Sequence, residues 1–104
     1  MEFVREKTLY EIISSKSLVL AYFWAVDCPS CHQADSFILD LENAYKGKIT
    51  IVKINAQTEI ELIKAFHIDA VPFFIIFKDA KVKAVVKGFK NRVDLEKRIR
   101  ENIA

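Results

Sequence analysis

The sequence predicts one α/β domain in which a central mixed β-sheet is flanked by helices on both faces. Three observations lead to this expectation. Apolar stretches with strand character alternate with amphipathic helical stretches along most of the chain. The stretch Leu18–Trp24 is apolar throughout and rich in aromatic and branched residues, which is typical of a strand buried on both faces. Two consecutive strands before the final helix indicate that a hairpin ends the sheet.

The predicted order is helix, strand, helix, strand, helix, strand, strand, helix. A further short strand near Glu2–Arg5 is a weaker expectation. The sequence pattern places the helices at Thr8–Ser14, Pro29–Tyr45, Thr58–His67 and Asn91–Ile103, and the strands at Leu18–Trp24, Lys48–Asn55, Phe73–Lys78 and Ala80–Gly88.

Local signals define the ends and the buried faces of these helices. Gly47 is placed to end the second helix, Thr58 and Glu61 form a capping-box pattern, and Asn91 is the expected N-cap of the last helix. The helical period of 3.6 predicts the inward faces. The inward residues are expected to be Leu9, Ile12 and Ile13; then Ala34, Phe37, Ile38, Leu41, Ala44 and Tyr45; then Ile60, Ile63 and Phe66; and finally Leu95, Ile99 and Ile103.

The composition is that of a folded protein. Of 104 residues, 52% are hydrophobic and 29% are charged, which supplies one core for a single domain over residues 1–104. The net charge of +2 is spread without a basic stripe, so we expect no nucleic-acid partner. The longest apolar run, Leu18–Val26, is too short for a membrane span, and the N-terminus shows no secretory signal. We therefore expect a cytoplasmic monomer that does not contact a membrane.

The only two cysteines lie three residues apart in C-P-S-C, where the buried strand passes into a helix. The positive end of a helix stabilises a thiolate, and the thiolate is the reactive form of cysteine. Cys28, at the edge of the helix, is the expected attacking thiol, and Cys31, one turn inside, is the expected resolving thiol. Pro29 suits the first turn because its missing N–H has no helical partner to lose.

The cysteine pair also fits non-catalytic roles. The two cysteines are compatible with plain core residues. A zinc site within one chain would need His32 and His67 as further ligands, and their spacing is not that of a zinc finger. A cluster shared between two chains, with two cysteines from each, is a further possibility.

The segment "LAYFWAVDCPSCHQAD" resembles the active-site segment of the thioredoxin family, in which C-x-x-C follows a central strand. The segments "KINAQTEIELIKAFHIDAVPFFIIFKDAKV" and "KGFKNRVDLEKRI" resemble the second half of a thioredoxin, so the likeness runs from about Thr8 onward. It implies a thioredoxin-like fold whose N-terminal strand is shortened or absent. It also implies a thiol–disulfide oxidoreductase that reduces or exchanges protein disulfides.

The resemblance assigns roles to several residues. Cys28 and Cys31 would form the redox-active disulfide, with no other cofactor and no metal. Pro72 would follow a cis bond from Val71 and, with Gly88, bind the backbone of client proteins. Trp24, Pro29 and Ser30 would contribute to the same docking surface. A reductase similar to thioredoxin reductase, or a small thiol, would recharge the pair.

Some positions depart from the thioredoxin pattern. Tyr22 replaces the buried aspartate that accepts the proton of the resolving cysteine, although the nearby family lysine is present as Lys53. Water, Tyr22 or His32 would have to substitute for that aspartate. Asp27 replaces a tryptophan, and its carboxylate would oppose thiolate formation at Cys28 or serve as the helix N-cap. His32 lies one turn beyond Cys28 and, if protonated, would support its thiolate.

These departures leave two other functions open. The proline directly after the first cysteine resembles glutaredoxin, so a glutaredoxin-like reductase is one alternative. The other is a non-catalytic module that keeps the fold and binds a metal or an iron–sulfur cluster through the same cysteines. If the protein is a thiol–disulfide oxidoreductase, the Pro-Ser interior of the motif predicts an intermediate reduction potential. It should lie between about −270 mV, as in thioredoxin, and the glutaredoxin range near −200 to −230 mV.

Overall fold

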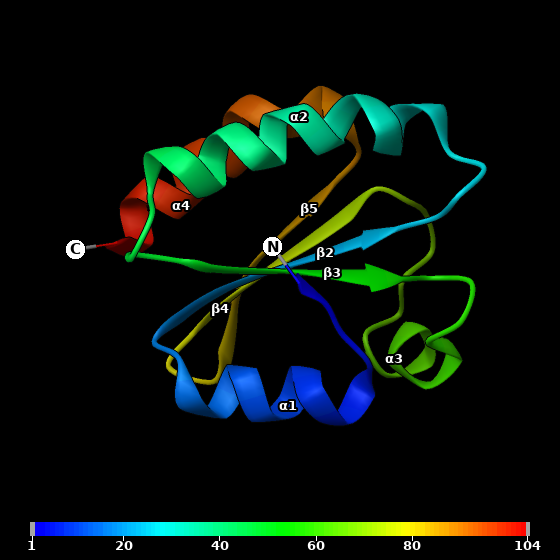
Figure 1. Ribbon diagram of the computed structural model, residues 1–104, viewed down its shortest axis with the longest axis horizontal. Coiled ribbons are helices and arrows are strands. Elements are labelled where there is room, and N and C mark those ends of the chain that lie inside the picture. The colour runs from blue at the N-terminus through cyan, green and yellow to red at the C-terminus, as the bar shows by residue number, and fades with distance from the viewer. Residues whose placement is uncertain (1, 104) are drawn as a thin grey trace.

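The computed structural model describes residues 2–103 and contains a five-stranded mixed sheet with helices on both faces (Figure 1). The strand order is β1-β3-β2-β4-β5, in which β1, β3 and β2 are parallel and β4 is antiparallel to both of its neighbours. Met1 and Ala104, at the ends of the predicted domain, lie outside the described residues. The strands are β1 (Glu2–Phe3), β2 (Leu18–Trp24), β3 (Thr50–Asn55), β4 (Phe73–Lys78) and β5 (Lys81–Lys87).

The helices form two layers, with α2 and α4 on one face of the sheet and α1 and α3 on the other (Figure 1). This arrangement confirms the predicted fold class and the predicted order of elements. The described helices are α1 (Glu6–Ser15), α2 (Pro29–Ala44), α3 (Ile60–Ala65) and α4 (Arg92–Ile103), and a 3₁₀ turn, η1 (Phe89–Asn91), precedes α4.

Strand β2 is the centre of the sheet and contributes to both cores. Its side chains alternate in direction, so Leu18, Leu20 and Tyr22 pack under α2 and α4. The intervening Val19, Ala21 and Phe23 pack toward α1 and α3. All six are buried, which is why this stretch is apolar without interruption.

The N-terminal edge strand is present but very short. Glu2 and Phe3 pair in parallel with Val52 and Lys53 of β3. The weaker expectation of a strand near Glu2–Arg5 is therefore confirmed, and so is the expectation of a shortened N-terminal strand.

Two turns form as their residues predict. Gly47 has a φ of 81° just after α2, a conformation that glycine adopts readily and that ends the helix. The connection between β4 and β5 is a two-residue hairpin in which Asp79 and Ala80 both have positive φ. Such backbone angles match the twist of paired strands, so the predicted hairpin is confirmed.

Two helix caps differ from the expectation. Thr58 donates its hydroxyl hydrogen to Asn55 or Glu59 instead of capping α3, whose N-cap residue Glu59 makes no side-chain cap. Asn91 is the last residue of η1, and its side-chain amide donates to the carbonyl of Lys87. Both predicted caps are wrong because the chain turns tightly just before each helix and these side chains bond to that turn.

Most residues on the predicted inward faces are buried or half-buried, with two exceptions. Ile60 begins the short helix α3 and is exposed, while Leu62 takes the buried place. Ala44 ends α2 and is also exposed. Both residues stand at one end of their helix, Ile60 as the first residue of α3 and Ala44 as the last residue of α2.

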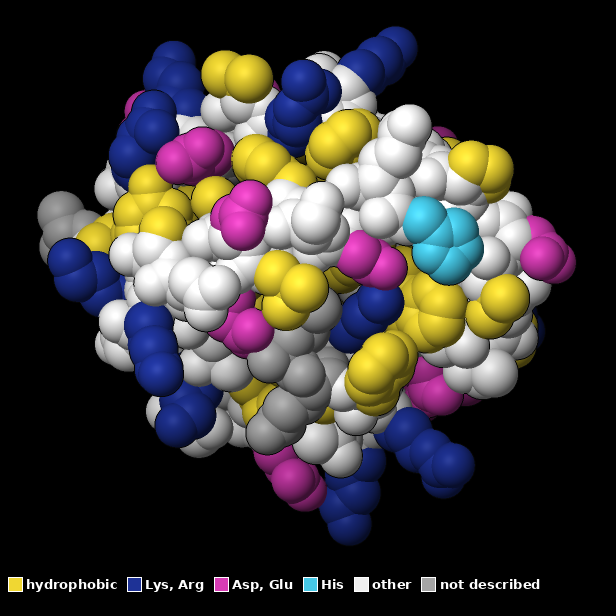
Figure 2. All heavy atoms as spheres, turned by 45° about the horizontal axis from the view of Figure 1, so that its top comes forward, with side chains coloured by type: hydrophobic (Ala, Val, Ile, Leu, Met, Phe, Trp, Pro, Cys, Tyr) yellow, Lys and Arg dark blue, Asp and Glu magenta, His cyan; other side chains and the backbone are white. Residues whose placement is uncertain are grey.

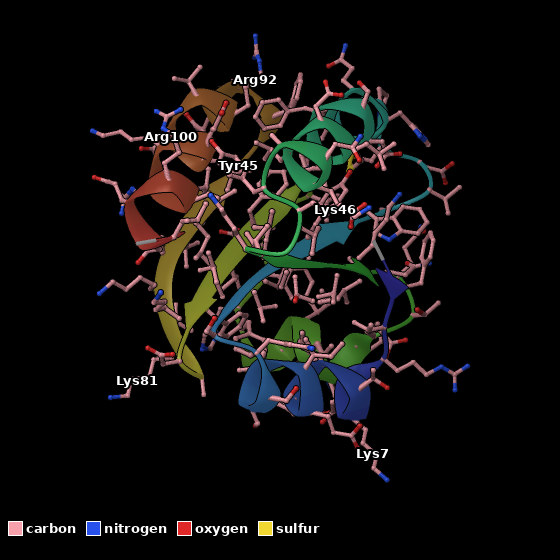
Figure 3. All side chains as sticks on the ribbon, turned by 60° about the vertical axis from the view of Figure 1, so that its left-hand side comes forward. Lys7, Tyr45, Lys46, Lys81, Arg92 and Arg100 are labelled. Carbon is pink, nitrogen blue, oxygen red and sulfur yellow. A yellow bond between two sulfur atoms is a disulfide. The ribbon has the colours of Figure 1, made fainter. Side chains whose placement is uncertain are left out.

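The surface carries both signs of charge, with hydrophobic side chains between them (Figure 2). Apolar side chains fill the space between helices and sheet, whereas Lys7 and Lys81 extend away from the molecule (Figure 3). Tyr45, after α2, reaches α4 and donates its hydroxyl hydrogen to Glu96. Within residues 2–103, no helix is long and apolar enough to cross a membrane.

The inward face of α4 should carry much of the stability of its layer. Ile99 is fully buried against the sheet, so Ile99→Ala leaves a cavity and should lower the free energy of unfolding by about 2–5 kcal/mol. Val93 on the same helix is 76% exposed, and Val93→Ala should change it by less than about 0.5 kcal/mol. Urea unfolding measures both variants, and equal losses would contradict the assigned faces.

Candidate active site

The two cysteines lie where β2 ends and α2 begins. Strand β2 ends at Trp24, and a short exposed turn leads to α2, whose first residue is Pro29. Cys28 is the N-cap residue and has an extended backbone. Proline at the first helical position confirms the sequence prediction and brings the chain abruptly from sheet to helix.

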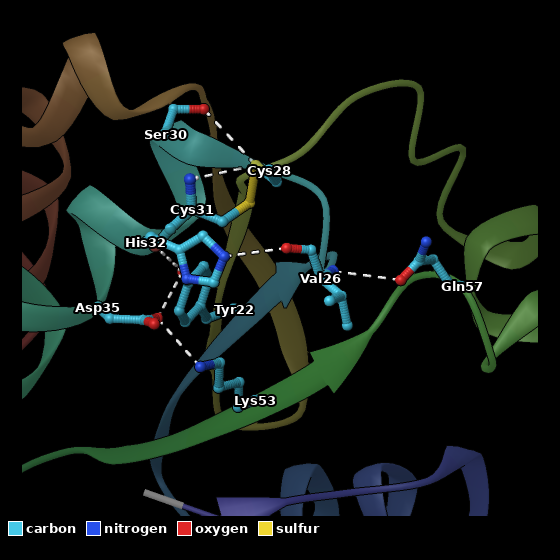
Figure 4. The surroundings of a disulfide bond; sticks show 9 residues. All are labelled: Tyr22, Val26, Cys28, Ser30, Cys31, His32, Asp35, Lys53 and Gln57. Atoms are coloured by element: carbon cyan, nitrogen blue, oxygen red, sulfur yellow. Dashed lines mark hydrogen bonds and ion pairs between the residues drawn. A yellow bond between two sulfur atoms is a disulfide. The ribbon is translucent and has the colours of Figure 1, made fainter.

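Cys28 and Cys31 are joined by a disulfide bond (Figure 4), and their Cα atoms are 5.2 Å apart. The Sγ of Cys28 accepts a hydrogen bond from the backbone N–H of Cys31 at 3.1 Å and lies 3.6 Å from the Ser30 hydroxyl. Cys28 is 6% exposed and Cys31 is 1% exposed. The order of exposure fits an outer attacking sulfur and an inner resolving sulfur.

Asp27 is not the N-cap of α2, so that alternative is wrong. The capping atom is the sulfur of Cys28, one residue later, and the Asp27 side chain is exposed on the preceding turn. The first turn of α2 contains no acidic residue. No carboxylate in the first turn therefore competes with the Cys28 sulfur for the positive end of the helix. This favours a thiolate at Cys28 once the disulfide is reduced.

Pro72 and Gly88 lie at the same edge of the sheet as the disulfide. Phe73, the first residue of β4, pairs with Phe23 near the end of β2 and with Lys87 at the end of β5. Pro72 is buried, and the bond from Val71 to Pro72 is cis, as the resemblance implied. The backbone N–H of Gly88 donates to the Pro72 carbonyl at 2.9 Å, so these two residues adjoin.

Gly88 needs the conformational freedom of glycine. Its φ of 83° and ψ of 152° lie in a region almost restricted to glycine. A Cβ at this position would meet only the Lys90 side chain, at 4.0 Å, so the space beside Gly88 is open. Gly88 also lines a hollow of about 500 Å³ together with Ser30, which lies between the two cysteines in the sequence, and with Gln33, Phe89, Lys90 and Arg92.

Beneath the cysteines, Tyr22 joins β2 to α2 through its hydroxyl group (Figure 4). This side chain is fully buried, and its oxygen lies 2.8 Å from the Cys31 carbonyl oxygen and 2.9 Å from Asp35 Oδ1. Asp35 Oδ1 is also 3.0 Å from Lys53 Nζ on β3. A polar cluster of Tyr22, Asp35 and Lys53 therefore connects two strands to the helix that carries Cys31.

The pKa of the Tyr22 hydroxyl lies far above its usual value near 10. The largest cause is burial, which disfavours the phenolate, followed by the hydrogen bond to Asp35 and repulsion by its charge. The hydroxyl group therefore keeps its proton across the physiological range and acts as a hydrogen-bond donor.

Lys53 is buried between aromatic rings as well as paired with Asp35. Its Nζ lies 4.5 Å from the ring centre of Trp24, 5.3 Å from that of Phe3 and 5.6 Å from that of Tyr22. The faces of these rings attract an ammonium group and partly replace its hydration. Trp24 is half-buried, and its ring also contacts Phe3 edge-on, so it links β2 to the N-terminal strand.

The ring of His32 is directed toward Val26. Its Nε2 lies 2.9 Å from the carbonyl oxygen of Val26, and the side chain is exposed. This contact closes the turn between Trp24 and α2, and Gln57 holds the other side of the turn by accepting from the Val26 N–H. The influence of His32 on the Cys28 thiolate stays a prediction.

Sequence reasoning did not single out Asp35 as a site residue. The signal was its spacing: Asp35 follows Cys31 by four residues, which places both on one face of a helix. Its contacts to Tyr22 and Lys53 needed the folded sheet. Among the residues that the structure describes, no group of three or more His, Cys, Asp or Glu is arranged to hold a metal ion.

The buried hydroxyl of Tyr22 predicts a loss of stability in alkali. Because folding raises its pKa, the stabilising contribution is complete below about pH 10 and declines as the pH rises further. The free energy of unfolding of the oxidised protein should therefore fall above pH 10 by up to about 1.4 kcal/mol per pH unit from this group.

Urea unfolding from pH 8 to pH 11 measures this loss. Tyr22→Phe should show a shallower decline, whereas Tyr10→Phe, which removes a tyrosine hydroxyl from an exposed position on α1, should follow the wild type. Identical pH dependence in all three proteins would contradict the assignment.

The comparisons with known proteins agree with this geometry. The thioredoxin family profile matches residues 1–101. Thioredoxin C-2 of Corynebacterium nephridii is 30% identical over 93 residues, which cover 89% of this chain and 86% of that protein. Thioredoxin (Mala s 13) of Malassezia sympodialis superposes with a TM-score of 0.91 at 18% identity, covering 99% of this chain and 93% of that chain. Plasmodium falciparum thioredoxin superposes with a TM-score of 0.90 at 22% identity, covering 97% of this chain and 98% of that chain. The profile match over nearly the whole chain shows that this protein belongs to the thioredoxin family.

Proposed function

We propose that this protein is a thiol–disulfide oxidoreductase that reduces protein disulfides with the Cys28–Cys31 pair. The observation that carries the proposal is the disulfide at the N-terminus of α2, with the more exposed sulfur accepting a backbone N–H. That donor and the helix end stabilise the Cys28 thiolate after reduction. Family membership supports the same reaction class.

The reaction proceeds in two exchanges. The Cys28 thiolate attacks one sulfur of a client disulfide, forms a mixed disulfide and releases the other client sulfur as a thiolate. The Cys31 thiolate then attacks the sulfur of Cys28, forms the internal disulfide and releases the second client sulfur. Two electrons pass to the client, and a thioredoxin-reductase-like enzyme or a small thiol returns them.

The client backbone would dock at the sheet edge beside the disulfide. Val71, Pro72 and Gly88 adjoin there, and the open space above Gly88 leaves room for an extended chain. Ser30 reaches the hollow from the helix side, while Pro29 is exposed at the first turn. We place Trp24 at the margin of this surface, and we propose that the protein works as a monomer in the cytoplasm.

The two cysteines should fail in different ways when substituted. Cys28→Ser should lower dithiothreitol-driven reduction of insulin disulfides to the rate of dithiothreitol alone, because the attacking sulfur is gone. Cys31→Ser should instead accumulate a mixed disulfide with the client, visible on a non-reducing gel. Ser36→Ala, an exposed position on the same helix, is the control and should keep full turnover. Full turnover by Cys28→Ser would refute the assignment.

The reduction potential of the pair fixes the direction of exchange. We expect a value between about −270 and −200 mV, in the range of thioredoxins and glutaredoxins. Equilibration in redox buffers followed by trapping of free thiols measures it. A value near −120 mV would indicate an oxidant. The absence of a reversible two-electron step would favour a non-catalytic module that binds a metal or an iron–sulfur cluster.

A further inference from the structure

The hydroxyl group of Tyr22 lies close to more hydrogen-bond acceptors than it has hydrogens to donate. It carries one hydrogen, yet both the Cys31 carbonyl oxygen and Asp35 Oδ1 lie within 2.9 Å of its oxygen. A carbonyl and a carboxylate both accept hydrogen bonds and donate none. A proton on the carboxyl group of Asp35 would let Asp35 donate to Tyr22 while Tyr22 donates to Cys31. When Asp35 holds a proton, both contacts of the Tyr22 hydroxyl can therefore be full hydrogen bonds.

The ionised form of Asp35 also has a partner in the same place. Lys53 Nζ lies 3.0 Å from Oδ1, and the side chain of Lys53 is only 10% exposed. The Lys53 ammonium donates to Oδ1 and so holds the Asp35 side chain beside β3. Asp35 thus has suitable contacts both with and without a proton, as a group that accepts and releases one requires.

The other ionisable groups around Cys31 are less suited to accept its proton. Tyr22, on β2, stays protonated because burial raises its pKa, and Lys53, on β3, is an ammonium group held by Asp35. His32 is turned toward the Val26 carbonyl. The remaining groups are exposed: Asp27 lies on the turn before α2, and Lys90 and Arg92 line the hollow that Ser30 also lines.

We propose that Asp35, positioned by Lys53 and Tyr22, accepts the proton of the Cys31 thiol during resolution of the mixed disulfide. The proposal rests on the oxidoreductase function and adds a proton acceptor to it. Asp35 follows Cys31 by one helical turn, and the Tyr22 hydroxyl lies between Asp35 Oδ1 and the backbone carbonyl oxygen of Cys31 (Figure 4). Its side chain is 33% exposed, so the proton that the carboxylate accepts can pass on to solvent.

Atoms and electrons balance in this step. The S–H bond of Cys31 breaks, its proton passes to the carboxylate of Asp35, and the electron pair stays on the Cys31 sulfur. That sulfur forms a bond to the Cys28 sulfur, and the bond from Cys28 to the client sulfur breaks. The departing sulfur takes its electron pair as a thiolate, and Asp35 later returns its proton to solvent or to the client.

Stopped-flow reaction of the reduced protein with excess 5,5′-dithiobis(2-nitrobenzoate) separates the two exchanges. The first phase of thionitrobenzoate release reports the attack by Cys28, and the second, concentration-independent phase reports resolution by Cys31. Asp35→Asn should slow the second phase by about 10- to 100-fold near pH 7 and affect the first phase much less. Without the carboxylate, the second rate should then rise about tenfold per pH unit until Cys31 ionises by itself.

Three further variants separate this role from a structural one. Asp35→Glu keeps a carboxylate and should restore most of the second phase, whereas Asp35→Ala should behave like Asp35→Asn. Asp40→Asn removes an exposed carboxylate from the same helix and should leave both phases unchanged.

The two kinetic phases test the role of Asp35 and the proposed oxidoreductase function separately. An unchanged second phase in Asp35→Asn, or equal slowing of both phases, would overturn the role of Asp35. A wild-type protein that shows no second phase would instead overturn the proposed oxidoreductase function, and the two failures are therefore distinguishable.

Discussion

Strand β2 is hydrogen-bonded to a strand on each edge and covered by helices on each face, and the position of the candidate active site depends on that burial. A strand so enclosed cannot shift by one residue, since every side chain would then change faces. Its end at Trp24 is therefore fixed relative to β3 and β4. The turn that follows places Cys28 at the edge of the sheet, directly before the first residue of α2. A mobile loop would not give the two sulfurs this definite position.

A markedly polar part of the interior lies below those sulfurs. Tyr22 belongs to a core cluster that is otherwise apolar, yet its hydroxyl has partners on α2, and Lys53 is buried with Asp35 and three rings around it. A lone ammonium in this position would be strongly destabilising, because burial removes its hydration. The carboxylate offsets that penalty and ties the layers together at the resolving cysteine. Stability and the proposed proton transfer thus use the same few atoms.

The chemistry of the thiols differs because their surroundings differ. Cys28 is at the positive end of a helix without an acidic residue in its first turn, which favours its anion. Cys31 is one turn further in and buried, and its carbonyl oxygen contacts the Tyr22 hydroxyl, which also contacts Asp35. Burial disfavours a thiolate there unless its proton has somewhere to go. In the proposed mechanism, Cys28 attacks as a thiolate, and Cys31 reacts only after its proton is removed.

The sequence by itself determined the order of the elements, the central buried strand and the position of the cysteine pair, because these depend on periodicity and on local turn chemistry. Leu18–Trp24 and Phe73–Lys78 were predicted with their observed ends. The caps predicted at Thr58 and Asn91, and the possible cap at Asp27, did not form, since each depends on how the preceding turn folds. Only the tertiary structure joined Asp35 to Tyr22 and Lys53. These residues lie on three elements far apart in the chain, and their contacts follow from the register of β2 with β3 beneath the first turns of α2.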